Sequence, residues 1–216
     1  MRVEVTENAG ALRTTSRVIH WAFWYDVLLK VISLGRERAF REKMLDIARL
    51  APGDVVLDAG CGTGTLAIAA KRRTGPTGAV YGIDASPKMV ARARRKTAKA
   101  RLEVSMEPAL LEAIPFPEGK FDLVITSLVM HHLPDDLLPR CLAEMRRVLK
   151  PGGRLVVFDF GGAEPHHWHW RKNHPHHAFK LDGIIPAITA AGFKDLERGK
   201  TGIIRGLMFV RAIANH

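Results

Sequence analysis

The sequence has few cysteines and no long apolar runs, and both shortages limit what the chain can be. Cys61 and Cys141 are its two cysteines, so the sequence indicates no disulfide framework. No apolar run is long enough to cross a membrane, because Asp26 and Lys30 interrupt the most apolar N-terminal segment. The opening stretch MRVEVTENAG has acids where a secretory signal needs an apolar core. These absences favour a cytoplasmic protein.

The chain also lacks internal repeats, and its composition is that of one globular domain. Of its 216 residues, 47% are hydrophobic and 25% are charged, which is enough for a single substantial core. We expect residues 51–216 to form the main body and residues 1–50 to form a helical cover within the same domain. The net charge is +11. Such a surface attracts nucleic acid, anionic lipid headgroups or acidic metabolites, although solvation alone explains it equally well.

Predicted strands and helices alternate along the chain. Residues 55–59 form a continuous apolar run, typical of a strand buried on both faces, and Ser86-Pro87 is typical of a helix start. The pattern predicts an α/β fold: a Rossmann-like, doubly wound, mostly parallel seven-stranded sheet with a C-terminal antiparallel strand and an N-terminal helical cover. The predicted strands are 55–59, 79–85, 102–106, 121–129, 154–160, 193–198 and 206–213, and the predicted helices are about 15–33, 36–50, 64–73, 86–100, 135–149 and 182–191.

The stretch VVLDAGCGTGTLAIAA, residues 55–70, places three glycines at alternate positions after the first predicted strand. In an open parallel sheet, ligands bind at the carboxyl ends of the strands, and glycines in the first turn let a ligand touch the backbone. Asp84 ends the second strand, where a carboxylate accepts both hydroxyls of a ribose. We therefore expect a nucleoside across the tips of these two strands. A dinucleotide is not favoured, because its G-x-G-x-x-G spacing needs glycine where Thr65 stands.

The G-x-G-x-G spacing resembles the first motif of class I S-adenosylmethionine-dependent methyltransferases. GIDASPKM is similar to the ribose strand and its helix, IPFPEGKFDLVITSLVMHHL to the fourth strand, and EMRRVLKPGGRLVVFDF to the approach to the fifth. The upstream segment WYDVLLKVISLGRERAFREKML resembles the UbiE-type methyltransferases of ubiquinone and menaquinone synthesis. The resemblance implies S-adenosylmethionine as the cofactor and a small, apolar acceptor, with a quinone precursor and a lipid headgroup as the leading candidates.

The resemblance also assigns roles in the predicted cofactor site. The glycines let the amino-acid portion of the cofactor approach the main chain, and Asp84 binds the ribose, with a plain surface acid as the alternative. Asp58 fixes the ammonium group or the loop that holds it, with a turn-capping acid as the alternative. Ser127 and Leu128 flank the methionine part. The whole predicted set is Asp58, Gly60, Cys61, Gly62, Thr63, Gly64, Asp84, Ala85, Met89, Glu107, Ser127 and Leu128.

The adenine site departs from the family pattern. The family has a G-D-A tripeptide after the third strand, shortly before L-P-F, whereas this chain reads MEPALLEAIPF. Glu107 replaces the aspartate if extra residues follow it. Pro108 then lacks the amide hydrogen that a donor role requires. A solvated loop acid is the alternative for Glu107.

Methyl transfer from a positively charged sulfur depends on positioning and desolvation, and it needs no metal. A base is required only if the acceptor must lose a proton. His131 follows the fourth strand and is one candidate base, with a packing or hydrogen-bonding role as the alternative. Tyr25 and Asp26 are the other candidates, provided that the N-terminal helices bring them over the site. Nearby, Trp21 and Trp24 would line the acceptor pocket or anchor that helix to the core.

The stretch EPHHWHWRKNHPHH, residues 164–177, suggests metal binding by its histidines. No cysteine joins them and the spacing matches no zinc site, so we predict no metal. The aromatic and basic residues of this stretch fit one of two roles. It would form a lid over the acceptor, closed together with residues 15–33, or make a peripheral contact with an anionic membrane surface.

Nucleic-acid methylation is the rival function, but TSLVMHH stands where those enzymes carry Asn/Asp-Pro-Pro-aromatic. A cofactor-binding protein without catalysis is a second rival, and the sequence leaves the oligomeric state open.

Overall fold

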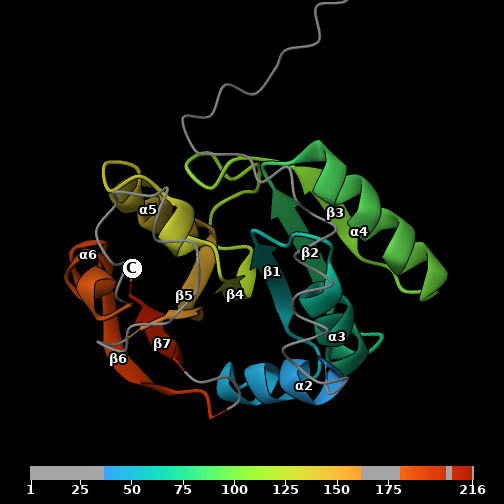
Figure 1. Cartoon of the computed structure of the whole chain (residues 1–216), viewed down its shortest axis with the longest axis horizontal. Coiled ribbons are helices and arrows are strands. Elements are labelled where there is room, and N and C mark those ends of the chain that lie inside the picture. Colours follow the sequence, from blue (N-terminus) through green and yellow to red (C-terminus); the bar gives the residue numbers. More distant parts are fainter. Residues whose placement is uncertain (1–36, 162–180, 203–205, 216) are drawn as a thin grey trace, which may run out of the picture.

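The computed structural model describes residues 37–161, 181–202 and 206–215, and helices and strands alternate through them (Figure 1). In chain order the elements are α2 (Glu37–Ile47), β1 (Val55–Ala59), α3 (Thr65–Thr74), β2 (Ala79–Asp84), α4 (Pro87–Lys99), β3 (Ser105–Pro108), β4 (Phe121–Ser127), η1 (Met130–His132), α5 (Leu138–Val148), β5 (Leu149–Phe160), η3 (Leu181–Ile184), α6 (Ile185–Ala190), β6 (Phe193–Lys200) and β7 (Leu207–Ala214). The predicted alternation of strands and helices is therefore confirmed.

The seven strands form one sheet in the order β3-β2-β1-β4-β5-β7-β6. Strands β1 to β5 pair in parallel, whereas β7 runs antiparallel to both of its neighbours. This confirms the predicted Rossmann-like α/β fold with its C-terminal antiparallel strand. The strand order reverses between β1 and β4: β2 and β3 lie on one side of β1, and β4 and β5 lie on the other. The carboxyl ends of β1 and β4 therefore lie side by side at the point where such sheets bind ligands.

Helices cover both faces of the sheet (Figure 1). Buried residues of α2, α3 and α4 pack into one apolar cluster and those of α5 and α6 into another. Neighbouring residues of β1 belong to different clusters, Val56 to the first and Leu57 to the second. A strand buried on both faces needs a continuous apolar run, which explains why residues 55–59 do not alternate.

Strand β3 begins three residues later than predicted and ends two residues later, at Ser105–Pro108 rather than 102–106. The chain continues its turn after α4, since the amides of Arg101 and Leu102 donate to carbonyls within that helix and Arg101 has a φ of 55°. The strand therefore begins pairing at Ser105, opposite Tyr81 of β2. Glu107 consequently lies within the strand, and the expected loop position for it is wrong.

Helix α5 ends at Val148, just before the segment KPGG, whose proline and glycines favour a helix end. Residues 150–153 belong to β5, which begins at Leu149 beside an irregularity in its pairing with β4. A Cβ at Gly153 would lie 2.8 Å from the Lys150 carbonyl oxygen, so glycine there permits a close backbone approach. Helix α5 is also shorter than predicted, because a turn closed by the Leu137 amide and the Pro134 carbonyl precedes it.

Candidate functional site

The turn after β1 folds back over the end of β2. Its first two amides, those of Gly60 and Cys61, donate to the Ile83 carbonyl at 2.9 and 2.8 Å. The three alternate glycines all have left-handed φ values, of 81° at Gly60, 52° at Gly62 and 77° at Gly64. Glycine adopts this conformation without steric cost, so the backbone alone explains much of the motif.

The three glycines differ in what surrounds them. A Cβ at Gly60 would lie 2.4 Å from Cγ2 of Val129, and one at Gly64 would lie 2.9 Å from Cβ of Ala93 on α4. A Cβ at Gly62 would meet no atom within 4 Å. Packing against the protein therefore accounts for the outer two glycines. The open space for a ligand to approach the backbone lies at Gly62.

Asp58 is buried at the end of β1, and the structure shows one of the two roles weighed for it. Its carboxylate accepts a hydrogen bond from the Ala67 amide in the first turn of α3, as a turn-capping acid would. Its Oδ2 is also buried and has no hydrogen-bond partner among the described residues. Burial raises the pKa of Asp58 to about 7, although the positive charge of Arg41 acts in the opposite direction. A bound ammonium group would satisfy this oxygen.

Asp84 ends β2, as predicted, and it holds the neighbouring turns. Its Oδ2 accepts from the Gly62 amide at 2.9 Å and its Oδ1 accepts from the Ser86 amide at 2.8 Å. Burial raises the pKa of Asp84, while these two hydrogen bonds lower it in part. Each carboxylate oxygen has a second lone pair, so Asp84 retains acceptor capacity for two hydroxyls. Its partners show that it is more than a surface acid.

The other predicted contacts near β2 lie around Asp84. Ala85 follows it directly and is half-buried, and Met89 is buried in the first turn of α4, where its amide donates to Ser86 Oγ at 3.4 Å. Glu107 is half-buried opposite Ile83 at the end of β3. The ends of β2 and β3 and the start of α4 therefore bring this group together.

Within the glycine turn, Cys61 and Thr63 are buried. Lys96 of α4 donates to Thr63 Oγ1 at 2.7 Å, so a helix on one face of the sheet anchors the turn. Burial raises the pKa of the Cys61 thiol well above its usual value, which keeps that side chain neutral. Packing explains both residues without assigning them a chemical role.

The chain leaves β4 through a strained residue. Leu128 has a φ of 58°, which is unfavourable for a branched side chain, and its amide donates to the Phe158 carbonyl at 2.8 Å. Ser127 before it is half-buried and pairs with Phe158. The turn carries Val129 onto the Gly60 side of the site. Ser127 and Leu128 thus lie beside the glycine turn, and a strained backbone is typical of functional sites.

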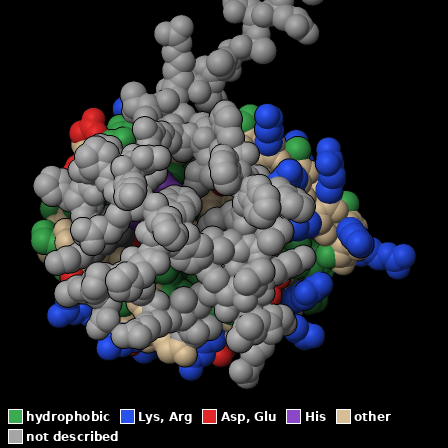
Figure 2. Space-filling model, in the orientation of Figure 1, with side chains coloured by type: hydrophobic (Ala, Val, Ile, Leu, Met, Phe, Trp, Pro, Cys, Tyr) green, Lys and Arg blue, Asp and Glu red, His purple; other side chains and the backbone are tan. Residues whose placement is uncertain are grey.

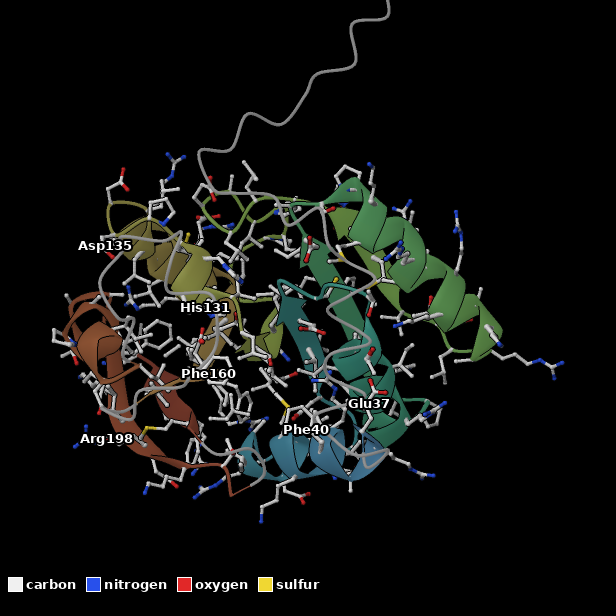
Figure 3. The ribbon with its side chains drawn as sticks, in the orientation of Figure 1. Glu37, Phe40, His131, Asp135, Phe160 and Arg198 are labelled. Atoms are coloured by element: carbon white, nitrogen blue, oxygen red, sulfur yellow. The ribbon has the colours of Figure 1, made fainter. Side chains whose placement is uncertain are left out.

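His131 lies in η1, directly after this turn, and is bound by Asp159 of β5. The distance between His131 Nδ1 and Asp159 Oδ1 is 2.7 Å, and Asp159 is fully buried while a quarter of the His131 side chain is exposed. Figure 3 shows His131 and Phe160 close together near the middle of the view, away from Glu37 and Phe40 of α2. A hydrogen-bonded histidine at a strand tip can be structural or can serve as a base.

Sequence reasoning missed Arg41, Lys96 and Asp159. A buried acid ending an apolar strand, as in RLVVFDF, is a recognisable signal for Asp159, because Asp58 and Asp84 end their strands in the same way. No sequence pattern links Arg41 of α2 to Asp58, or Lys96 to Thr63, because these contacts depend on how the helices pack.

Several predicted residues lie outside the described residues. These are the catalytic candidates Tyr25 and Asp26, the tryptophans Trp21 and Trp24, and the histidine-rich stretch 164–177. Over the ranges 37–161, 181–202 and 206–215, no group of three histidine, cysteine or acidic side chains is arranged to hold a metal ion.

Chemically, the site fits a nucleoside that carries a positive charge. The open backbone at Gly62, the partly engaged carboxylate of Asp84 and the unsatisfied oxygen of Asp58 lie at neighbouring strand ends. Together they offer space, ribose acceptors and an acid for an ammonium group. The second half of the site, at the ends of β4 and β5, contributes an imidazole and the half-exposed ring of Phe160.

Comparisons with known proteins agree with this geometry. Residues 56–153 match the family described as a methyltransferase domain. The chain is 40% identical over 138 residues to the ubiquinone/menaquinone biosynthesis C-methyltransferase UbiE of Geobacter sulfurreducens, which covers 63% of this chain and 53% of that protein. It is 40% identical over 136 residues to a demethylmenaquinone methyltransferase of Thermus thermophilus, covering 63% of this chain and 60% of that protein.

Among solved structures, a SAM dependent methyltransferase from Aquifex aeolicus superimposes with a TM-score of 0.70 at 25% identity, over 81% of this chain and 89% of that one. The fold therefore has a known counterpart. The chain spans a little over half the length of the two curated relatives that it matches.

Proposed function

We propose that the chain carries a class I methyltransferase domain related to the UbiE-type enzymes and that it transfers a methyl group from S-adenosylmethionine to a small, apolar acceptor. One curated relative is named for ubiquinone/menaquinone biosynthesis and another is named a demethylmenaquinone methyltransferase, which favours a quinone precursor as the acceptor. A lipid headgroup is the alternative acceptor. No observation on the described residues favours a nucleic acid over either of these.

In this proposal the cofactor supplies a methyl group that is already activated by its positively charged sulfur. Asp84 would accept the ribose hydroxyls, and the backbone at Gly62 would lie along the amino-acid portion. Asp58 would pair with the ammonium group, and Glu107 would approach the adenine. Ser127 and Leu128 would border the reacting end, next to the acceptor.

The observation that carries the proposal is the unsatisfied, buried Oδ2 of Asp58 beside the open backbone of Gly62. A dinucleotide has no ammonium group to satisfy such an acid at this position. We expect titration calorimetry to show S-adenosylhomocysteine binding in the micromolar range, about −8 kcal/mol. Binding of NADH without binding of S-adenosylhomocysteine would contradict the proposal.

The acceptor is tested by transfer of a radiolabelled methyl group. Reduced naphthoquinone and benzoquinone precursors, a lipid extract and RNA would be offered separately with labelled S-adenosylmethionine. The proposal predicts label in the quinol fractions. Label confined to RNA would instead establish the rival function, with an affinity that falls steeply with salt. His131, Tyr25 and Asp26 are the proposed catalytic residues for an acceptor that loses a proton.

We also propose that the protein is cytoplasmic and contacts anionic membranes through α4. The exposed side chains Lys88, Arg94, Arg95 and Lys99 lie on this helix, which contains no acid. Figure 2 shows Lys and Arg side chains gathered on the side of the molecule where Figure 1 draws α4. None of the helices in the described parts of the chain is long and apolar enough to span a bilayer. A surface contact would give access to an apolar acceptor held in lipid.

Liposome sedimentation tests this contact. Vesicles with anionic lipid should retain the protein and neutral vesicles should not. The double variant Arg95→Glu/Lys99→Glu should lose retention, whereas Lys194→Glu/Lys200→Glu, the same charge change on exposed β6 positions, should keep it. Equal loss in both variants would leave net charge, rather than α4, as the cause.

A further inference from the structure

His131 and Asp159 form a hydrogen-bonded pair that the proposed cofactor contacts do not use. They come from the ends of neighbouring parallel strands, His131 from the turn after β4 and Asp159 from the last part of β5. Their side chains meet at 2.7 Å, with Asp159 fully buried. A buried acid that contacts a partly exposed imidazole at a ligand-binding edge calls for a chemical explanation.

The surroundings of Asp159 fix which partner supplies the proton. Its Oδ1 also accepts from the Phe160 amide at 2.8 Å, and its Oδ2 accepts from the His131 amide at 3.3 Å. A carboxylate is an acceptor only, so the hydrogen in the contact with the ring belongs to His131 Nδ1. The remaining ring nitrogen of a neutral imidazole, Nε2, is then the one that carries a lone pair.

The backbone holds this arrangement in place. Leu128 has its left-handed φ of 58° just before η1, and its amide is tied to the Phe158 carbonyl of β5. The His131 amide is tied to the same carboxylate as the His131 ring. Both the position of the residue and the orientation of its ring therefore depend on β5. This double attachment is more than packing alone requires.

We propose that Asp159 is a positioning residue, which locks His131 in the Nδ1–H tautomer and so presents Nε2 as the base for the methyl acceptor. This inference rests on the proposed methyltransferase function and narrows its substrate class to acceptors with an acidic hydroxyl, such as a quinol. The O–H bond of the acceptor breaks, its electron pair stays on the oxygen, and the proton passes to Nε2. Asp159 stabilises the imidazolium that forms, as the buried acid does in a catalytic triad.

The rings around His131 suit an acceptor of this kind. His132 lies with its ring centroid 3.8 Å from that of His131, and the Phe160 ring lies edge-on at 6.2 Å. Phe160 is 39% exposed and is the single exposed large hydrophobic side chain on the part of the chain that the structure describes. An apolar, aromatic acceptor would pack on such rings, which a small hydrophilic amine would not.

The direct test reads the tautomer and needs no catalysis. In protein labelled with ¹⁵N-histidine, long-range ¹H–¹⁵N spectra distinguish a protonated ring nitrogen from an unprotonated one, and His131→Gln identifies the His131 signals. We expect the Nδ1–H tautomer in the wild-type protein. In Asp159→Asn the amide can donate to Nδ1, so the proton should move to Nε2. An Nε2–H tautomer of His131 in the wild-type protein would overturn the proposal, whether or not Asp159→Asn folds.

The kinetic test uses 1,4-naphthohydroquinones that differ in the acidity of their hydroxyl groups. Asp159→Asn should lower kcat by about 100-fold or more for the least acidic member, the usual contribution of a general base. The loss should shrink as the hydroxyl becomes more acidic, because less help with proton removal is needed. Asp159→Glu should recover part of the rate. If the decrease in kcat did not depend on the acidity of the hydroxyl group, Asp159 would have a purely structural role.

Asp122→Asn is the matched control, because Asp122 is another carboxylate of the sheet that accepts from a backbone amide, at the opposite end of β4. Asp122→Asn should leave the His131 tautomer unchanged, and it should not change how kcat depends on the acidity of the hydroquinone. The two tests also separate the two proposals. If the tautomer is as expected but no hydroquinone is methylated, the acceptor class is wrong; if methylation proceeds with Nε2–H, the positioning role is wrong.

Discussion

The acidic residues at the two edges of the sheet differ in their partners and in the direction of their pKa shifts. At the amino edge, which we define by Asp54, Asp122, Lys150 and Arg154, each acid meets a cation: Asp122 pairs with Lys150 at 2.8 Å and Asp54 with Arg154 at 2.5 Å. Although burial opposes it, the hydrogen bonds from Lys150 and the Val55 amide hold the pKa of Asp122 below its usual value.

At the carboxyl edge, defined by Asp58, Asp84 and Asp159, the acids are bound mainly by amides and an imidazole. Burial raises the pKa of Asp58 to about 7 and also raises that of Asp84. Aspartate therefore stabilises the fold at the amino edge, whereas burial of Asp58 and Asp84 costs stability at the carboxyl edge. Such a cost is typical of a site that gains its partner from a ligand.

The largest expected effect is the dependence of stability on pH that Asp58 causes at the carboxyl edge. Its folded pKa of about 7 lies above the ordinary value of 3.8, so the folded state holds a proton that the unfolded state releases. Stability should therefore be greatest below about pH 4 as far as this group is concerned, and it should fall as the pH rises to about 7. The shift corresponds to about 4 kcal/mol.

Asp58→Asn removes this penalty. Urea unfolding should show the variant to be more stable than the wild-type protein at pH 8 and similar to it below about pH 4, while its affinity for S-adenosylhomocysteine is reduced. A variant less stable than the wild-type protein at pH 8 would mean that Asp58 is already fully stabilised without a ligand.

The next largest effect is a difference in stability between variants of two glycines at the carboxyl edge. Gly60→Ala adds a Cβ 2.4 Å from Val129 at a φ of 81°, so we expect a loss of about 2–4 kcal/mol in the free energy of unfolding. Gly62→Ala adds its Cβ to open space and should cost about 1 kcal/mol, yet it should weaken cofactor binding. Thermal unfolding and calorimetry of both variants check this, and equal stability would contradict the packing assigned to Gly60.

Asp84→Ala should act chiefly on the ligand. The loss of hydrogen bonds to a charged acceptor should weaken S-adenosylhomocysteine binding by about 1.5–3 kcal/mol, as measured by calorimetry. The Gly62 and Ser86 amides also lose their acceptor, so a smaller loss of stability should accompany it. Unchanged affinity would exclude Asp84 from the ribose site.

The smallest expected effect is on stability at the amino edge, where the pKa of the acid is lowered rather than raised. Asp122→Asn removes an ion pair and weakens the hydrogen bond from the Val55 amide, so stability should fall by about 1 kcal/mol. The depressed pKa of Asp122 means that its contribution is present above the ordinary pKa of 3.8 and is lost as the pH falls through its folded pKa. Urea unfolding at pH 7 and pH 3 checks this, and cofactor affinity should not change.

Much of the fold could be predicted because its signals are local. The apolar run 55–59 and the Ser86-Pro87 helix start carry their structure within a few residues, and both were predicted correctly. Strand β3 was misplaced because the turn at Arg101 continues α4 by backbone hydrogen bonds that no residue type announces. The proline and glycines of KPGG follow the end of α5, as their residue types suggest, but no residue type indicates that they belong to β5, where Gly153 permits a close backbone approach.

The site divides in the same way. Asp84 and the glycine turn were found because their spacing along the chain reflects the geometry of one strand-turn-helix unit. Asp159 was missed because its partner, His131, lies on another strand and the contact exists only once β4 and β5 pair. The glycines were explained by a ligand, whereas packing explains two of them. The spacing of glycines along the sequence shows where a side chain is not tolerated, but only the fold shows which neighbouring atoms lie there.

The central claim is that the carboxyl edge is the ligand-binding edge and the amino edge is structural. Backbone amide spectra of ¹⁵N-labelled protein, recorded during titration with S-adenosylhomocysteine, test this at both edges in one measurement. We predict large shifts at residues 58–64, 84–89 and 127–132, and unchanged signals at residues 118–122 and 149–154. Shifts concentrated at the second group, or no shifts at millimolar ligand, would contradict the account.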